Sequence, residues 1–350
     1  MIASQKNKLG RVDLYVTGMS FGGVAIGNLF RPICELESDA MIQRAWDAGI
    51  RYYDTAPMYG HGLSELRIGH SLRRKNRDDF VLSSKVGRIL KPKRRSEIDF
   101  GPWIEAAPFE MRFDYTYDGT MRSFEDSLQR MALERMDICF IHDIDRFTRG
   151  DAQPEVFRQA MDGCWKALAR LRSEGLVKAI GVGVNEWEVC HEALKQRDFD
   201  CFLLAGRYTL LEQDPLDEFL PLCEKRNAVV VVGAGFNSGI LATGAVEGAR
   251  YNYAPAPAGI MERVRRIEAI FRAHDVPLPA AAMQFVLAHP AIASFVAGMR
   301  TVAQLVQNVN WLSHPIPAAF WSDLKTKGLL REDAPTPRPI RDRCRPALKS

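Results

Sequence analysis

Eight short apolar runs with strand character recur along the chain, and a segment with helical periodicity follows each of them. The runs are rich in β-branched and aromatic residues, which is typical of β-strands. They cover residues 14–21, 50–54, 80–85, 136–142, 177–183, 199–205, 228–234 and 292–298. The helical patterns cover residues 38–49, 64–74, 119–131, 156–175, 185–197, 214–226, 260–275 and 301–312.

Strict alternation of strand and helix predicts a parallel sheet with helical crossovers, and eight repeats are the number that closes a (β/α)8 TIM barrel. An open Rossmann sheet is the weaker alternative, because GMSFGGVAIG (18–27) does not keep the GxGxxG spacing. We therefore predict an α/β fold with one barrel domain over residues 1–332. The Pro- and Arg-rich segment 333–350 has no apolar periodicity, so we expect it to drape over the surface or to be disordered.

Composition narrows the class of protein. The formal charge of +4, from 47 basic and 43 acidic residues, implies no strong attraction to nucleic acid or to an anionic membrane. The seven cysteines form no CxxC pair, so we expect neither a disulfide framework nor a zinc site. The first residues lack the apolar core of a signal peptide, and no apolar run approaches the roughly 18 residues of a membrane span. We expect a cytoplasmic protein that binds no metal.

Four titratable side chains fall where successive apolar runs end. Asp54, Lys85 and His142 end the second, third and fourth runs, and Tyr59 lies on the loop TAPMYGHG (55–62) just beyond Asp54. Because barrel active sites lie at the carboxyl ends of the strands, these four side chains should converge on one rim. Each one alone has a structural explanation, such as a turn cap or loop packing. Together they favour a catalytic site.

The chemistry of these four groups is complementary. The pKa of a free phenol is about 10, and we expect the Lys85 ammonium to lower the pKa of Tyr59 so that it can exchange a proton. Asp54 would act as the counter-ion of Lys85. His142 could donate a hydrogen bond to a substrate oxygen and hold the reacting carbon against a hydride donor.

The stretch DTAPMYG (54–60), followed by SELRIG (64–69), resembles the aldo-keto reductases, whose pattern is Asp-Thr-Ala-x-x-Tyr-Gly. The resemblance extends from about Gly18 to Asn308. It implies a barrel that binds a nicotinamide dinucleotide without a Rossmann domain and transfers hydride between the nicotinamide and a carbonyl or alcohol carbon. It also implies that Asp54, Tyr59, Lys85 and His142 form the family's catalytic tetrad.

The resemblance implies cofactor contacts at the remaining strand ends. Asn185 would meet the nicotinamide carboxamide, the loop GAGFNSGIL (233–241) would wrap the pyrophosphate, and GMRTVAQLVQN (298–308) would bind the adenosine. The alternative for the loop 233–241 is a flexible Gly-rich connector. The candidate residues in these two segments are Gly235, Asn237, Ser238, Gly239, Leu241, Gly298, Arg300, Gln304 and Asn308.

The chain departs from the family in two places. Ala205 and Gly206 stand where many members have a glutamine for the carboxamide, and Gly298 and Gln304 stand where NADP-dependent members carry basic residues. Arg300 is the only cation of that segment, so we expect NAD as cofactor and leave NADP open. The basic stretch RILKPKRR (88–95) could restore NADP preference if it folds over the adenosine.

The segments 113–131, 205–216 and 233–241 resemble one branch of the family, which oxidises D-threo-aldoses such as L-fucose or D-arabinose at C1 to lactones. The alternative within this branch is oxidation of pyridoxal at its 4-position. The long segment 87–118 would line the substrate rim, or merely seal a loop, with Trp103, Phe109, Phe113 and Tyr115. An alternative of another class is a nicotinamide-binding sensor similar to potassium-channel β subunits. A small-molecule substrate is the only partner expected, and the oligomeric state stays open.

Overall fold

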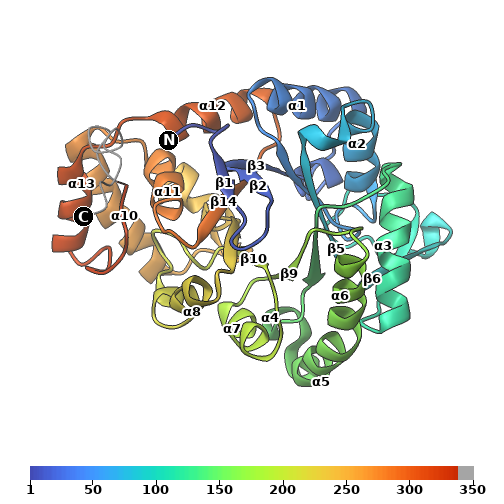
Figure 1. Cartoon of the computed structure of the whole chain (residues 1–350). Helices are drawn as coiled ribbons and strands as arrows, with labels where there is room; N and C mark the ends of the chain where they lie inside the picture. Colours follow the sequence, from blue (N-terminus) through green and yellow to red (C-terminus); the bar gives the residue numbers. More distant parts are fainter. Residues whose placement is uncertain (338–350) are drawn as a thin grey trace.

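Eight parallel strands close into a barrel in the computed structural model, which describes residues 1–337 (Figure 1). Around the barrel the strands follow the order β10-β11-β14-β3-β4-β5-β8-β9. Their bounds are β3 Met19–Gly22, β4 Tyr52–Asp54, β5 Val81–Val86, β8 Ile138–His142, β9 Ala179–Val184, β10 Cys201–Ala205, β11 Val229–Gly233 and β14 Ile292–Gly298. Each of the eight predicted runs supplies one barrel strand, so the (β/α)8 fold is confirmed.

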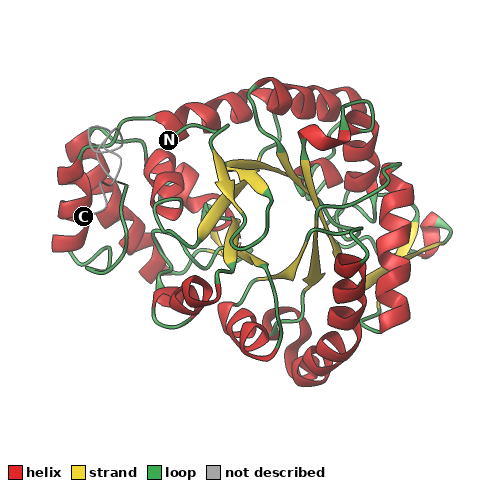
Figure 2. Cartoon of the chain, in the orientation of Figure 1, coloured by secondary structure: helices red, strands yellow, loops and turns green. Residues whose placement is uncertain are grey.

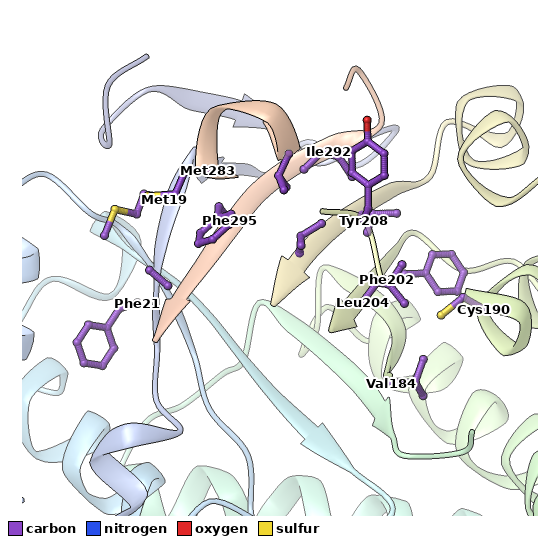
Figure 3. Packing of buried hydrophobic residues seen from close by; sticks show 14 of the residues in the cluster. Met19, Phe21, Val184, Cys190, Phe202, Leu204, Tyr208, Met283, Ile292 and Phe295 are labelled. Carbon is purple, nitrogen blue, oxygen red and sulfur yellow. The ribbon is translucent and has the colours of Figure 1, made fainter. Parts of the chain in front are cut away.

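The strand β11 shows why these runs read as almost continuously apolar. Val229 and Val231 pack inside the barrel, whereas Val230 and Val232 face the surrounding helices. Successive side chains of a strand point to opposite faces, and both faces of a barrel strand are covered. Figure 3 shows part of the outer packing, including Phe202 and Leu204 of β10 and Phe295 of β14.

Helices surround the barrel as a ring (Figure 2). Their bounds are α1 Glu35–Asp47, α2 Leu63–Leu72, α3 Tyr117–Met131, α4 Arg146–Arg149, α5 Gln153–Gln159, α6 Trp165–Ser173, α7 Trp187–Gln196, α8 Phe219–Arg226, α9 Ile240–Thr243, α10 Ala258–His274, α11 Leu278–Val286, α12 Val302–Ser313 and α13 Ala318–Thr326. The predicted helix 156–175 is α5 and α6, joined by a π-helical segment at Ala160–Cys164. Sequence patterns missed α11, because every one of its residues is buried and it has no polar face.

The first predicted strand, 14–21, is wrong as a single element. It divides into β2 (Tyr15–Thr17), which pairs with β1 (Lys6–Lys8) in an antiparallel hairpin, and the barrel strand β3. Leu9, Leu14 and Val16 of this hairpin join the apolar cluster inside the barrel. The hairpin therefore closes the amino end of the barrel. The apolar run could not reveal the break, because most residues of both parts are buried.

Two further hairpins lie at the carboxyl end of the barrel. β6 (Arg88–Pro92) pairs with β7 (Phe109–Phe113) inside the long segment after β5, and β12 (Arg250–Tyr251) pairs with β13 (Ala254–Pro255) after β11. The predicted tail begins at residue 333, but Ala334 is buried against the core, and residues 338–350 lie outside the described part. Within residues 1–337, no helix combines the length and the apolar character that a membrane crossing needs.

Candidate active site

Three neighbouring strands bring the four predicted side chains to the carboxyl end of the barrel. β4, β5 and β8 are adjacent in the barrel. Asp54 is the last residue of β4, Lys85 is the last but one of β5, and His142 is the last of β8. Tyr59 lies on the loop after β4. The order of the strands thus explains why residues far apart in the sequence meet.

Lys85 and Asp54 form a buried ion pair. Lys85 Nζ lies 3.0 and 2.8 Å from the two carboxylate oxygens of Asp54 and also donates to the backbone oxygen of Thr55 at 2.8 Å. Ser83 Oγ donates a further bond of 2.7 Å to Asp54. Burial acts to lower the pKa of Lys85, but Asp54 and Tyr59 together outweigh it and raise that pKa. Lys85 is therefore a fixed cation at neutral pH.

Tyr59 lies between this cation and His142. Lys85 Nζ is 4.7 Å from the centre of the Tyr59 ring, and the rings of Tyr59 and His142 meet edge to face with their centres 6.2 Å apart. Burial raises the pKa of Tyr59 to about 12, and the nearby Lys85 lowers it only in part. The expectation that Lys85 brings the pKa below its ordinary value is therefore wrong for the protein without ligands. The direction of the Lys85 effect is as expected.

His142 is buried and uncharged at neutral pH. The pKa of His142 lies well below its usual range. Burial is the main cause, and the positive charges of Arg88 and Lys85 lower the pKa further. A neutral imidazole can donate from one ring nitrogen only. The ring can therefore act as a hydrogen-bond donor to a substrate oxygen without adding a charge.

Some of the aromatic residues of the segment 87–118 lie beside the candidate reaction site, and others support the backbone around it. Trp103 packs beside Tyr59 with ring centres 6.0 Å apart, so it lies next to the candidate reaction site. The hydroxyl of Tyr115 donates to the backbone oxygen of His142 at 2.8 Å, and this ring is buried. Phe113 stacks on Tyr115 and is half-exposed, whereas Phe109 accepts a backbone bond from the His61 ring. Trp103 is thus the rim aromatic that contacts the tetrad.

A hollow of about 460 Å³ lies between the loop after β11 and the helix α12. Six of the residues predicted to bind the cofactor line it, namely Gly235, Ser238, Gly239, Gly298, Gln304 and Asn308. Cβ atoms built at Gly239 and Gly298 would meet nothing within 4 Å, so the space beside both residues is open. The adjoining start of α12, at Val302, offers backbone N–H groups and a positive dipole end. This set of hydroxyl, amide and backbone donors fits the phosphates and adenosine of a dinucleotide.

The remaining predicted cofactor residues are placed differently. Asn237 is buried and donates to the backbone oxygen of Gly206 at 2.9 Å, and its own side-chain oxygen has no hydrogen-bond partner among residues 1–337. Leu241 does not reach the hollow, because its side chain belongs to the core and its N–H donates to Phe236. The side chain of Arg300 turns toward the loop after β3, where it donates to the backbone oxygen of Leu29.

Asn185 is held by groups that sequence reasoning did not identify. Its N–H donates to Asp145 Oδ2 at 2.6 Å, and its side-chain oxygen accepts from the hydroxyl of Tyr253 at 3.1 Å. Tyr253 belongs to the turn between β12 and β13 and also donates its N–H to Ser238 Oγ at 2.9 Å. No pattern pointed to Tyr253, because two-residue hairpin strands carry too little periodicity to be recognised.

Three of the five basic side chains of the stretch 88–95 are engaged elsewhere. Arg88 pairs with Asp143, Lys93 pairs with Glu110, and Arg95 donates to the backbone oxygen of Ala106. These contacts hold the three side chains within the β6–β7 region, away from the α12 segment. Within residues 1–337, no group of three or more His, Cys, Asp or Glu side chains is arranged to hold a metal ion.

Comparison with known proteins agrees with this geometry. The family model described as "Aldo/keto reductase family" matches residues 18–328. A pyridoxal 4-dehydrogenase from Microbacterium luteolum is 43% identical over 94% of this chain and 98% of its own length. A D-threo-aldose 1-dehydrogenase from a Pseudomonas species is 40% identical over 96% of this chain and 100% of its own. A solved aldo-keto reductase of Bacillus halodurans shares the fold at a TM-score of 0.69 and 23% identity, over 92% of this chain and 96% of that one.

Proposed function

The chain belongs to the aldo/keto reductase family and is an NAD(P)-dependent oxidoreductase, and on that premise we propose that it oxidises C1 of an aldose such as L-fucose or D-arabinose to a lactone. The observation that carries the proposal is the buried Lys85–Asp54 pair beside the Tyr59 phenol, with the neutral His142 ring on its other side. The similarity to the aldose dehydrogenase extends over nearly the full length of both chains.

In the proposed reaction the C1 hydroxyl of the sugar lies between Tyr59 and His142. His142 donates a hydrogen bond to the sugar oxygen and fixes its position, and Tyr59 takes the hydroxyl proton. Lys85 stabilises the phenolate form of Tyr59, and Asp54 holds Lys85 in place. A nicotinamide held at Asn185 would supply the acceptor for the hydride of C1. General acid–base groups of this kind contribute about 10²- to 10⁴-fold to the rate.

The phenol pKa gives the oxidation a direction of pH dependence. Because the pKa of Tyr59 is about 12 without ligands, little phenolate exists at neutral pH. Any cation placed beside the ring lowers that pKa further, as Lys85 does. Oxidation should therefore accelerate as the pH rises, and carbonyl reduction, which needs the protonated phenol, should not.

On the cofactor side, we propose that Ser238, Gly239 and the start of α12 hold the phosphates, and that Asn185 holds the carboxamide. When the cofactor binds, the carboxamide would replace the Tyr253 hydroxyl as the hydrogen-bond partner of the Asn185 side-chain oxygen. NAD is the favoured cofactor, because Arg300 is already bonded to Leu29 and three basic residues of 88–95, Arg88, Lys93 and Arg95, are engaged elsewhere. A cytoplasmic location is part of this proposal.

Pyridoxal is the second candidate substrate, favoured by the 43% identity to a pyridoxal 4-dehydrogenase. The flat face of Trp103 beside Tyr59 could stack on a pyridine ring as well as on the apolar face of a sugar. The cyclic hemiacetal of pyridoxal offers the same reacting group as a pyranose, a carbon that bears one hydroxyl and one ether oxygen.

A substrate panel separates these candidates. L-fucose, D-arabinose, L-galactose and pyridoxal would each be given with NAD and with NADP, and the reduced cofactor would be followed by its absorbance. We expect fastest turnover with an aldose and NAD. Preference for pyridoxal would select the second candidate, and cofactor binding without turnover on any of them would instead support the sensor alternative.

A further inference from the structure

A second buried ion pair lies directly behind His142. Arg88 Nη2 of β6 lies 2.5 Å from Asp143 Oδ2, and both side chains are less than a tenth exposed. Asp143 follows His142 in the sequence, and its other carboxylate oxygen, Oδ1, lies 3.5 Å from Nε2 of the His142 ring. The carboxylate therefore contacts both the guanidinium and the imidazole.

The backbone around Asp143 is fixed so that the carboxylate can face the ring. Asp143 has a φ of 52°, a left-handed conformation that residues other than glycine adopt infrequently. Its N–H donates to the backbone oxygen of Gly183 at 3.0 Å. The Tyr115 hydroxyl donates to the backbone oxygens of both His142 and Asp143, at 2.8 and 2.9 Å. These three restraints hold the unusual turn.

The charged and titratable groups around His142 come from four elements. Lys85 projects from β5, Arg88 from β6, Asp143 from the end of β8, and the phenol of Tyr59 from the loop after β4. A carboxylate alone beside an imidazole would favour the imidazolium form. Asp143 makes no hydrogen bond to the ring at 3.5 Å, but its negative oxygen still draws the single imidazole proton to the facing Nε2, while the Arg88 guanidinium offsets its charge. The pair therefore selects a tautomer without adding a proton.

We propose that Arg88 and Asp143 are positioning residues for His142, which together keep its ring neutral with the single proton on Nε2. Because Asp143 Oδ1 lies 3.5 Å from Nε2 and makes no hydrogen bond to it, the Nε2 proton stays available for the substrate oxygen. The neutral ring also adds no positive charge that would compete with Lys85. This inference rests on the proposed role of His142. It makes Arg88, the first residue of β6, part of the support of the catalytic site, although neither residue contacts the reacting atoms.

The two members of the pair should act in opposite directions on the acid limb of the pH profile of kcat/KM. Arg88→Met leaves Asp143 uncompensated, so the imidazole charges more readily and the acid limb moves to higher pH. Asp143→Asn leaves the guanidinium alone, so the ring stays neutral and the limb does not rise, but kcat/KM falls at every pH by about tenfold because the tautomer is no longer selected. Arg88→Lys should keep the limb near its wild-type position.

The double variant Arg88→Met/Asp143→Asn removes both charges and should return the limb toward its wild-type position. Arg77→Met is the matched control, because Arg77 forms a buried pair of the same 2.5 Å length with Asp137 at the amino end of β8. It should leave the pH profile unchanged.

A measurement without turnover keeps this inference separate from the proposed function. In ¹⁵N-histidine protein, with the His142 signals assigned through His142→Gln, the ring should show a protonated Nε2 and an unprotonated Nδ1 in the wild type. Arg88→Met should raise the titration midpoint of the ring, and Asp143→Asn should mix the two tautomers.

If wild-type protein turns over no substrate while the ring behaves in this way, the proposed function fails and the pairing stands. If the variants lose stability and activity together, with an unmoved acid limb and unchanged ring signals, the pair only anchors the hairpin and the inference is wrong.

Discussion

Strand β8 carries a buried arginine–aspartate pair at each end, and the two pairs have different surroundings. At the amino end Asp137 pairs with Arg77 and also accepts the backbone N–H of Leu82 at 2.9 Å. At the carboxyl end Asp143 pairs with Arg88 and lies against His142. Both pairs are 2.5 Å long and mostly buried.

The difference lies in what the spare groups of each pair contact. The amino-end pair bonds to backbone atoms, so its role is to hold strands in register. Leu9, Leu14 and Val16 close the barrel at this end. The carboxyl-end pair faces titratable rings. The same ion pair is therefore structural at one end and electrostatic at the other. Substitutions at the two ends should separate stability from catalysis.

The largest effect should come from Tyr59→Phe at the carboxyl end. Loss of the transferable proton should reduce kcat by about 10²- to 10⁴-fold, whereas cofactor affinity and thermal stability should hardly change. Steady-state kinetics and a cofactor titration measure both. If the variant kept more than about a tenth of the wild-type kcat, Tyr59 would not transfer the proton, and the contrast between the two ends would lose its basis.

A nearly equal loss of kcat should follow Lys85→Met, accompanied by lower stability. The substitution leaves the buried Asp54 carboxylate uncompensated, which typically costs about 3–5 kcal/mol. It also removes the charge that lowers the pKa of Tyr59, so the alkaline limb of the oxidation profile should move upward.

The double variant Lys85→Met/Asp54→Asn is the control for Lys85→Met. It should recover stability in chemical denaturation without recovering activity. An alkaline limb that stays in place would mean that Lys85 does not tune the phenol.

Arg77→Met should show the reverse behaviour at the amino end. The substitution leaves Asp137 without its arginine partner and removes bonds to the backbone oxygens of Phe80 and Arg135. The free energy of unfolding should therefore fall by about 3–5 kcal/mol. At a temperature where the variant stays folded, kcat should change by less than about twofold. A marked loss of kcat in fully folded protein would contradict the division between the ends.

The smallest effect should come from Arg300→Ala, beyond both pairs. Arg300 is bonded to the backbone oxygen of Leu29, and burial followed by the charge of Arg31 lowers its pKa. We expect kcat/KM with NAD to equal or exceed that with NADP in the wild type. The substitution should reduce only the NADP value, by about tenfold at most, because one charge-assisted bond is at stake. A tenfold or greater wild-type preference for NADP would overturn this expectation.

The sequence determined the barrel and the positions of the tetrad on it. Eight apolar runs separated by amphipathic helices have one efficient way to bury both faces of each strand, which is a closed parallel barrel. Asp54, Lys85 and His142 end successive runs, so the fold alone brings them together. The motif DTAPMYG then indicated their chemistry. Local pattern and strand position were enough, because both are properties of the chain order.

Only the tertiary structure decided how these groups are charged and what supports them. The pKa of Tyr59 depends on how far burial outweighs Lys85, and burial is set by packing from several loops. The Arg88–Asp143 pair joins residues 55 positions apart through a hairpin that the sequence showed only as a long segment. Tyr253 reaches Asn185 from 68 positions away. Such long-range contacts between polar side chains leave no periodic signature, because they depend on the direction in which each loop folds back over the barrel mouth.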